Sequence, residues 1–442
     1  MRRRDFLGGA GLLLAALATG CGSTAGLPSR PAEDLSSGEG SLLKIDAARR
    51  STLTDEQARG RFADFGADLF RAVVAAGATP GNTLVSPYSV VSALGMTALG
   101  ARAATLDLFR DLLGGDPTEV AAALTTADAA LAAAVAAGTR DGMGKKVQTA
   151  VDAANMIWAQ SGYDVRPEFL QALAEGYAAG MRVTDFVAAP EGARRAINAW
   201  VSERTHELIP TLLPDGSITD ITRMVLVNAL YLKASWHLPF DEDSTAPGTF
   251  ISAAGAAVQT DLMHRVLTSG YAEGDGWQAA VLPYAGRDLA MTVVLPEEAR
   301  FDEVGAALGK GLLLEVADAP DAEITLTFPS FESRTAVSLQ DALGALGAGD
   351  LFADDIDLSG IAGKPGDLVI GDVIHEARII VDEKGTEAAA ATAVLVEAGS
   401  APPPAEPRKV DLVVDHAFYY VIHDTATATP LFVGQVIDPT AG

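Results

Sequence analysis

The sequence contains one cysteine, Cys21, among its 442 residues, so the chain cannot form an internal disulfide. Basic side chains are also scarce, because 32 Lys and Arg stand against 58 Asp and Glu, which gives a formal net charge of −26. Nucleic-acid binding needs Lys and Arg clustered against phosphates, and the sequence has no such cluster, so we expect no nucleic-acid partner. Hydrophobic residues make up 49% of the chain, enough for a large core, so stability must come from packing.

Motifs for catalysis and for cofactor binding are missing as well. The six histidines include no HExxH spacing, and the chain has no GxSxG elbow, no phosphate-binding Gly-Lys-Ser/Thr loop and no GxGxxG after a strand. Residues 355–360 resemble the start of a calcium loop, but Gly366 occupies the twelfth position, where a bidentate Glu is needed. We therefore expect no enzyme, no metal site and no cofactor.

The first 21 residues have the features of an export signal. Adjacent arginines precede Phe6, and an uncharged apolar stretch then runs to Leu17, which is too short to span a bilayer. The paired arginines resemble a twin-arginine signal, and residues 18–21 resemble a bacterial lipobox, although Ala18 stands where that motif usually has Leu. We expect lipidation of Cys21, with simple cleavage of the leader as the alternative.

The rest of the chain is predicted to be a linker followed by one domain. Residues 22–59 open with a stretch rich in Gly, Ser, Pro and Ala and are predicted to be a flexible linker, and residues 60–442 are predicted to form the domain. Helical periodicity dominates the first half, as in the alanine-rich residues 121–137, whereas short apolar runs such as residues 224–232 dominate the second half and predict strands. The predicted fold class is α+β around one core.

Residues 383–393 have an unusual pattern for an alanine-rich segment. If the segment is extended, alternate side chains point to opposite faces, and the face that begins with Thr386 is uncharged and small, whereas Glu387 falls on the other face. Such a segment could enter a sheet with its uncharged face buried, and Gly385 would be a hinge of low steric cost. A helix is the alternative, but the large residues lack helical spacing and Pro402 to Pro404 end the stretch.

The same segment carries a resemblance to a known family. Glu-Lys-Gly-Thr-Glu-Ala-Ala-Ala-Ala-Thr at 383–392 resembles the hinge of inhibitory serpins, and the likeness extends over about residues 61–439. The further segments that resemble the family, in the expected order, are residues 82–89 with 93–96, 155–158, 197–201, 227–233, His375 and 431–434.

The resemblance implies a fold and a mechanism. It implies three β-sheets, eight or nine helices and an exposed reactive loop that a protease attacks as a substrate, after which the loop inserts into the main sheet and traps the protease covalently. By family position, the reactive bond would join Gly399 to Ser400, with cleavage after Ala398, Leu395 or Val396 as alternatives. The hinge would consist of Glu383, Gly385, Thr386, Glu387, Ala388, Ala389, Ala390, Ala391 and Thr392. The polar cluster where the sheet opens would consist of Ser86, Ser89, Asn228 and His375, with Trp236 where the loop enters.

The resemblance also implies a partner and leaves alternatives. Residues 394–400 contain no Lys or Arg, so we expect an elastase-like or subtilisin-like serine protease, with a cysteine protease as an alternative. The lysine with which the family often pairs the acid at Glu383 is replaced by Ser330 in this sequence. We expect a monomer outside the cytoplasm, either secreted or held at the surface of a bacterial cell only by its lipid. A non-inhibitory carrier, chaperone or surface lipoprotein is the alternative function.

Overall fold

The computed structural model describes residues 40–49, 53–77, 81–135, 140–386 and 407–441. The α-helices are α1 Asp55–Ala58, α2 Ala63–Ala75, α3 Pro87–Ala98, α4 Ala103–Leu113, α5 Pro117–Ala134, α6 Pro167–Tyr177, α7 Pro190–Arg204, α8 Phe301–Ala307, α9 Lys310–Ala317 and α10 Gln340–Leu343. The strands are β1 Ser41–Leu43, β2 Thr83–Val85, β3 Ala150–Gln160, β4 Met181–Thr184, β5 Met224–Ser235, β6 Ala246–Ile251, β7 Ala257–Gly274, β8 Trp277–Pro283, β9 Leu289–Pro296, β10 Asp321–Pro329, β11 Phe331–Ser338, β12 Asp372–Asp382, β13 Gly385–Thr386, β14 Arg408–Val413, β15 Phe418–Asp424 and β16 Pro430–Val436. The predicted α+β class is confirmed.

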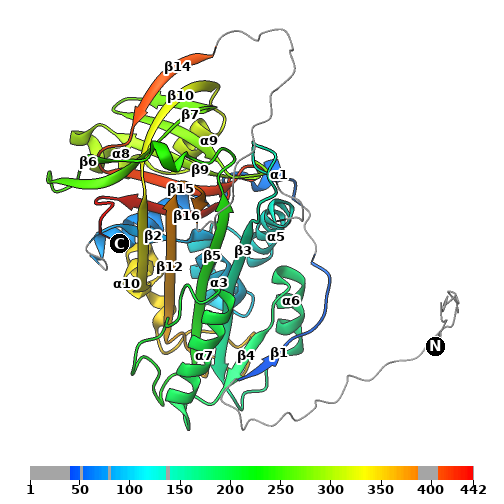
Figure 1. Ribbon diagram of the computed structural model, residues 1–442. Helices are drawn as coiled ribbons and strands as arrows, with labels where there is room; N and C mark the ends of the chain where they lie inside the picture. Colours follow the sequence, from blue (N-terminus) through cyan, green and yellow to red (C-terminus); the bar gives the residue numbers. More distant parts are fainter. Residues whose placement is uncertain (1–39, 50–52, 78–80, 136–139, 387–406, 442) are drawn as a thin grey trace, which may run out of the picture. The chain divides into compact units, whose positions relative to one another are not determined.

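The strands form one seven-stranded and one nine-stranded sheet (Figure 1). The first has the order β1-β4-β3-β5-β13-β12-β11, and the second has the order β14-β10-β7-β8-β9-β15-β16-β2, with β6 paired to β7. The expected second and third sheets are joined into the nine-stranded one, because β7 pairs with β10 through residues 262–270 and with β8 through residues 271–274. Among the described residues, eight helices have seven residues or more, in agreement with the expected eight or nine.

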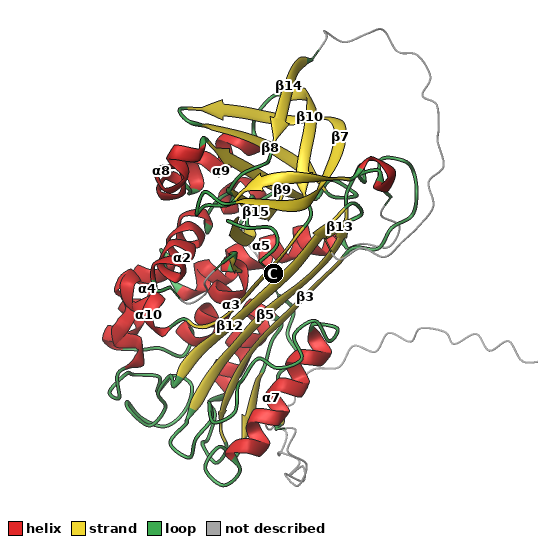
Figure 2. Cartoon of the chain, turned by 60° about the vertical axis from the view of Figure 1, so that its left-hand side comes forward, coloured by secondary structure: helices red, strands yellow, loops and turns green. Residues whose placement is uncertain are grey.

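The seven-stranded sheet is covered on both faces, which explains the apolar sequence of its centre. On one face lie α2 and α3, whose side chains belong to the main core with Leu226, Leu230 and Leu232 of β5. On the other face, Ile197 and Trp200 of α7 pack in one cluster with the alternate residues of β5, and Figure 2 shows α7 beside the lower part of the strands. A strand buried on both faces has no polar side to present, and β5 is accordingly almost uninterrupted in its apolar sequence.

The predicted linker over residues 22–59 is wrong for its second half. Residues 41–43 form β1, which extends the seven-stranded sheet by pairing with residues 181–183 of β4. Arg49 then donates to the Gly176 carbonyl at 2.9 Å and forms an ion pair with Asp128. A capping box starts α1 just before the predicted boundary. Because these contacts join residues far apart in the chain, they produce no local periodicity from which the sequence could predict them. Among the described residues, no helix has both the length and the apolar character needed to cross a bilayer.

Candidate functional site: the opening of the seven-stranded sheet

The chain reverses direction directly after β12 and enters the sheet that it has just left. The Asp382 carboxylate accepts hydrogen bonds from the backbone N–H groups of Lys384 at 2.8 Å and Gly385 at 3.1 Å, which fixes the turn. Gly385 and Thr386 then pair antiparallel with β5 on one side and with β12 on the other. Gly385 has a φ of +149°, and a Cβ at this position would lie 2.1 Å from the Ala234 carbonyl oxygen, so no other residue fits.

Below this two-residue wedge, the sheet is closed. Residues 225–230 of β5 pair directly with residues 372–377 of β12, and the two strands run parallel. Between this ladder and the wedge, residues 231–233 and 378–380 form no ladder with each other. The two central strands are therefore already parted at the end where β13 enters.

An aromatic group holds the hinge at its entry point. Thr386 is fully buried and shares a hydrogen bond of 2.7 Å with the Tyr284 hydroxyl, whose pKa is raised by burial. Tyr284 stacks on Trp236 with ring centroids 4.6 Å apart, and the Trp236 indole N–H donates to the Asp382 carbonyl at 2.9 Å. Trp236 and Tyr284 therefore both lie beside the start of β13, and the sequence prediction includes Trp236 but not Tyr284.

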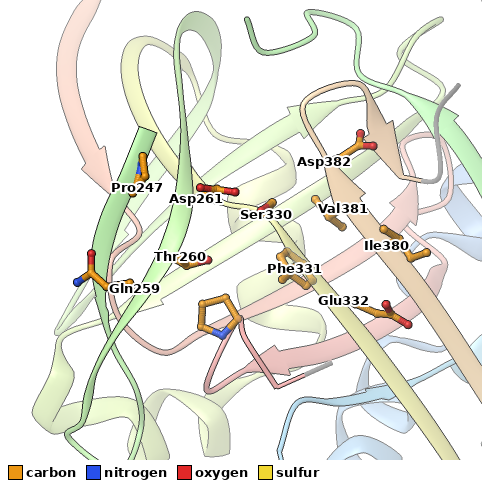
Figure 3. A pocket seen from close by; sticks show the side chains of 11 residues that line it. Pro247, Gln259, Thr260, Asp261, Ser330, Phe331, Glu332, Ile380, Val381 and Asp382 are labelled. Carbon is orange, nitrogen blue, oxygen red and sulfur yellow. The ribbon is translucent and has the colours of Figure 1, made fainter. Parts of the chain in front are cut away.

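The acidic residue of the hinge has a partner that the sequence did not suggest. The Glu383 carboxylate accepts a hydrogen bond of 2.8 Å from the Thr245 hydroxyl, and Lys384 forms an ion pair of 3.0 Å with Glu242. Ser330, which stands in the place of the family's lysine, instead lines an open groove of about 530 Å³ beside the upper end of β12 (Figure 3). Anchoring of this hinge thus uses residues 242–245, which follow β5 in the chain.

A row of polar side chains crosses the closed part of the sheet. Asn155 of β3, Asn228 of β5 and His375 of β12 are register partners on adjacent strands. The backbone N–H of Ser86 donates to His375 Nε2 at 3.1 Å, so the proton of the neutral imidazole lies on Nδ1, which donates to the Asn228 side-chain oxygen. Ser89 donates to the Asn155 side-chain oxygen at 2.7 Å. The row therefore ties the start of α3 to three strands.

The structure brings together all four predicted residues of the polar cluster. Ser86, Ser89, Asn228 and His375 are fully buried, and Ser86 also caps α3 by accepting from the Ser89 N–H. Asn155 belongs to the same group and was missing from the predicted set, although its alignment with Asn228 follows only from strand register. Separating β5 from β12 at this level would break the hydrogen bond between His375 and Asn228.

Titration of His375 should be visible in the pH dependence of stability. Burial lowers the His375 pKa to about 3, against about 6.5 in an unfolded chain. Between these values the unfolded state binds the extra proton, so stability present above pH ~6.5 is lost as the pH falls, by ~1.4 kcal/mol per pH unit. We expect His375→Gln to remove this slope from the urea unfolding free energy measured between pH 5 and 6.5. His423, whose pKa burial also lowers, is present in both proteins and cancels; equal slopes would contradict the prediction.

The segment after α7 bridges the strands on the opposite face. His206 Nε2 lies 2.8 Å from a carboxylate oxygen of Asp152 of β3, within hydrogen-bond distance, and the His206 ring packs at a tilted angle against Tyr231 of β5. Arg378 of β12 donates to the Leu208 carbonyl at 3.2 Å. These contacts span the region where β5 and β12 are not paired.

Several predicted site residues lie outside the described residues. They are Cys21, Glu387, Ala388, Ala389, Ala390, Ala391, Thr392, Gly399 and Ser400.

Comparisons with known proteins agree with this architecture. The sequence model of the family described as "Serpin (serine protease inhibitor)" matches residues 61–439. The chain is 33% identical over 369 residues to the leukocyte elastase inhibitor of Bos taurus, covering 81% of this chain and 93% of that protein. It is also 33% identical to serpin B3 of Homo sapiens, covering 81% of this chain and 94% of that protein.

A solved structure of a relative shows the same arrangement. The thermophilic serpin tengpin in its native state superposes with a TM-score of 0.76 at 25% identity, over 90% of this chain and 97% of that chain. The family description is that of protease inhibitors and not of catalysts, in line with the missing catalytic motifs. The matched residues include the strands that part around β13 and the polar row below it, and the chain belongs to the serpin family.

Proposed function

We propose that this chain inhibits serine proteases as a suicide substrate: the protease cuts the segment between β13 and β14, and the segment then inserts between β5 and β12. The observation that carries the proposal is the wedge of Gly385 and Thr386, which already occupies the path of insertion and pairs with both strands. Relatives named for the inhibition of leukocyte elastase support the same function.

The pairing of β13 with β5 and with β12 can be continued along the chain, and it then shows how many residues must insert between the two strands. From Thr386 onward, each register would put Thr392 opposite both Asn228 and His375, so that its hydroxyl would enter the polar row. The same count would put Leu395 opposite Val225 and Asp372, the last residues of the direct β5–β12 ladder. A cut before Leu395 would leave part of that ladder closed, so the reactive bond must follow it. Cleavage between Gly399 and Ser400 meets this condition.

Insertion supplies the free energy for trapping. An inserted strand would form backbone hydrogen bonds with β5 on one edge and with β12 on the other, whereas insertion breaks only the single direct ladder between β5 and β12. Full insertion therefore gains on the order of ten backbone hydrogen bonds. At ~0.5–1.5 kcal/mol each, they contribute roughly 5–15 kcal/mol, comparable to the stability of a whole domain. The covalent chemistry is that of the protease, whose serine forms the acyl-enzyme with the new C-terminus at Gly399.

The test is a covalent complex and the fragment that it releases. Mixing the protein with elastase or with subtilisin should give a complex that survives SDS, and mass spectrometry of the small C-terminal fragment should show Ser400 as its first residue. Trypsin serves as the matched control, because it cleaves after Lys or Arg and residues 385–407 contain neither. Mixing the protein with trypsin should therefore yield no such complex. A fragment that starts at Gly399 moves the bond by one residue, whereas a start before Glu397 contradicts the proposed position.

We also propose that the protein acts outside the cytoplasm and is anchored by lipid on Cys21. Support comes from the arginine pair, the short apolar stretch and the small residues before the only cysteine. When the protein is expressed with its own leader, we expect it to partition into detergent and Cys21→Ala to release it. An unmodified N-terminus and full recovery of the wild type in the aqueous phase would contradict this.

A further inference from the structure

The apolar strand β5 has a basic side chain near each of its ends. Within residues 223–235, Arg223 and Lys233 are the only charged residues. Both side chains are partly exposed, and among the residues that the structure describes neither forms an ion pair. The Arg223 guanidinium donates to the backbone carbonyls of two neighbouring residues, and the register partner of Lys233 on β3 is the uncharged Ala150. Both basic groups are therefore available to a further partner.

The charged residues of β12 differ, because they already have partners. Glu376 and Arg378 lie on the same face of the sheet as Lys233, by strand register and alternation. Glu376 forms an ion pair of 2.8 Å with Arg334 of β11. Arg378 forms an ion pair of 2.7 Å with Glu332, also of β11. A strand that enters between β5 and β12 thus meets unpaired charge on the β5 side.

The segment after β13 carries carboxylates at a matching spacing. Residues 387–400 contain two charged side chains, Glu387 and Glu397, which lie ten positions apart. Lys233 and Arg223 also lie ten positions apart and have the opposite charge. In an antiparallel pair of strands, equal spacing brings both pairs of opposite charges face to face in a single register. The segment and β5 are therefore complementary in charge.

The observed pairing of β13 selects this register. The two residues of β13 pair antiparallel with the upper end of β5 (Figure 2). Continuing this pairing puts Glu387 opposite Lys233. It puts Glu397 opposite Arg223, ten positions further along. A slip of one residue turns every side chain to the other face, and a slip of two loses both pairs. In one direction, that slip also sets the Glu397 carboxylate opposite the buried Val225.

We propose that two ion pairs with β5 fix the register of the inserted segment. Lys233 receives the carboxylate of Glu387, and this pair forms beside β13, at the start of insertion. Arg223 receives the carboxylate of Glu397, and this pair forms only when the segment has inserted to its end. The second pair lies two residues before Gly399 and therefore holds the end of the strand to which the protease is attached. This inference rests on the proposed function, because the occupant of the site is the cleaved segment of the same chain.

Charge reversal tests the pair at the far end of the strand. Arg223→Glu and Glu397→Lys should each lower the unfolding midpoint of the cut protein by about 1–3 °C, because attraction becomes repulsion, and the double variant should restore it. In the uncut protein, the direct β5–β12 ladder closes the path, so the two reversals should be additive. Equal coupling in the cut and uncut proteins would contradict a pair that depends on insertion.

The same reversal at the other end, with Lys233→Glu and Glu387→Lys, should also be restored in the cut double variant. The matched control crosses the two pairs: Lys233→Glu with Glu397→Lys joins charges at opposite ends of the strand, so their effects should add. At ~1 M salt, where the screening length is about 3 Å, the coupling within the matched pairs should shrink. Additive effects in both matched pairs of the cut protein would overturn the proposal.

A disulfide measures the register itself. In a form that starts after residue 21 and lacks Cys21, Glu397→Cys is combined with Arg223→Cys, or with Ile221→Cys or Val225→Cys as slipped controls. Diagonal neighbours lie about 7–8 Å apart, beyond the span of a disulfide. After the cut, the bond should therefore close at least tenfold faster at position 223 than at either control. Faster closure at 221 or 225 would overturn the register.

These experiments separate the ion pairs from insertion. A cut protein with no gain in its unfolding midpoint, and with no disulfide at any of the three positions, would contradict insertion and with it both proposals. A gain in the midpoint with additive charge reversals would leave insertion standing and contradict the ion pairs alone.

Discussion

A single cut in the segment between β13 and β14 should raise the thermal unfolding midpoint by on the order of 10–30 °C. Among the residues that the structure describes, Gly385 and Thr386 pair between β5 and β12, and the segment that follows them is held at both ends, at Thr386 and at Arg408. Cutting frees one end, and the strand can then extend through Leu395. Differential scanning calorimetry before and after a brief treatment with elastase measures the change.

A matched pair of variants separates insertion from any other effect of the cut. Thr386→Arg would place a charge in a fully buried site against Tyr284, which costs several kcal/mol, so β13 should leave the sheet and insertion should slow. The cut variant should then keep the midpoint of the uncut protein and be turned over as a substrate. Glu387→Arg, one residue further and directed to the opposite face by strand alternation, should retain the gain. An unchanged midpoint in the cut wild type, or an equal gain in both variants, would contradict the account.

The sequence predicts the local elements well where one periodicity dominates. The apolar run at 224–232 lies within β5. The alanine-rich residues 121–134 lie within α5, which begins earlier, at Pro117, because proline suits the first turn of a helix. The mostly apolar sequence of β5 shows that both faces are buried, but not which strands lie beside it. The α+β class follows from this order of helices and strands.

Contacts between distant segments were outside the reach of local patterns. The strand β1 falls inside the predicted linker, because three residues that pair with β4 carry no periodicity of their own. The pairing of Glu383 with Thr245, and of Thr386 with Tyr284, joins residues more than 100 positions apart. Such partners follow only from the register of strands in space.

The polar cluster is an intermediate case. Its four predicted members were found through family positions, and the structure explains why they belong together: Asn228 and His375 are register partners, and the start of α3 brings Ser86 beneath them. Asn155 completes the row by the same register and could have been inferred once β3 was known to pair with β5. Burial lowers the pKa of His375, and its hydrogen-bond partners in this row are the uncharged Ser86 N–H and Asn228 side chain. A contact between uncharged groups suits the proposed function, in which this contact breaks when the strands part.

The most direct test of the central claim is to lock β5 to β12 and then release them. Leu230 and Ala377 form the uppermost pair of the direct ladder, and neighbouring strands are ~4.8 Å apart, within the range that a disulfide spans. In a form that starts after residue 21 and therefore lacks Cys21, Leu230→Cys with Ala377→Cys introduces the only thiols. Insertion beyond Ala389 then requires this bond to be broken.

The measurement is the yield of SDS-stable complex with elastase before and after reduction of this double variant. We expect the oxidised protein to be cleaved without forming a complex and without any gain in its unfolding midpoint, and the reduced protein to form the complex. Each single-cysteine variant, which cannot close the bond, should behave as the reduced protein does under both conditions. An oxidised double variant that traps elastase as efficiently as its reduced form would show that inhibition does not require β5 and β12 to separate.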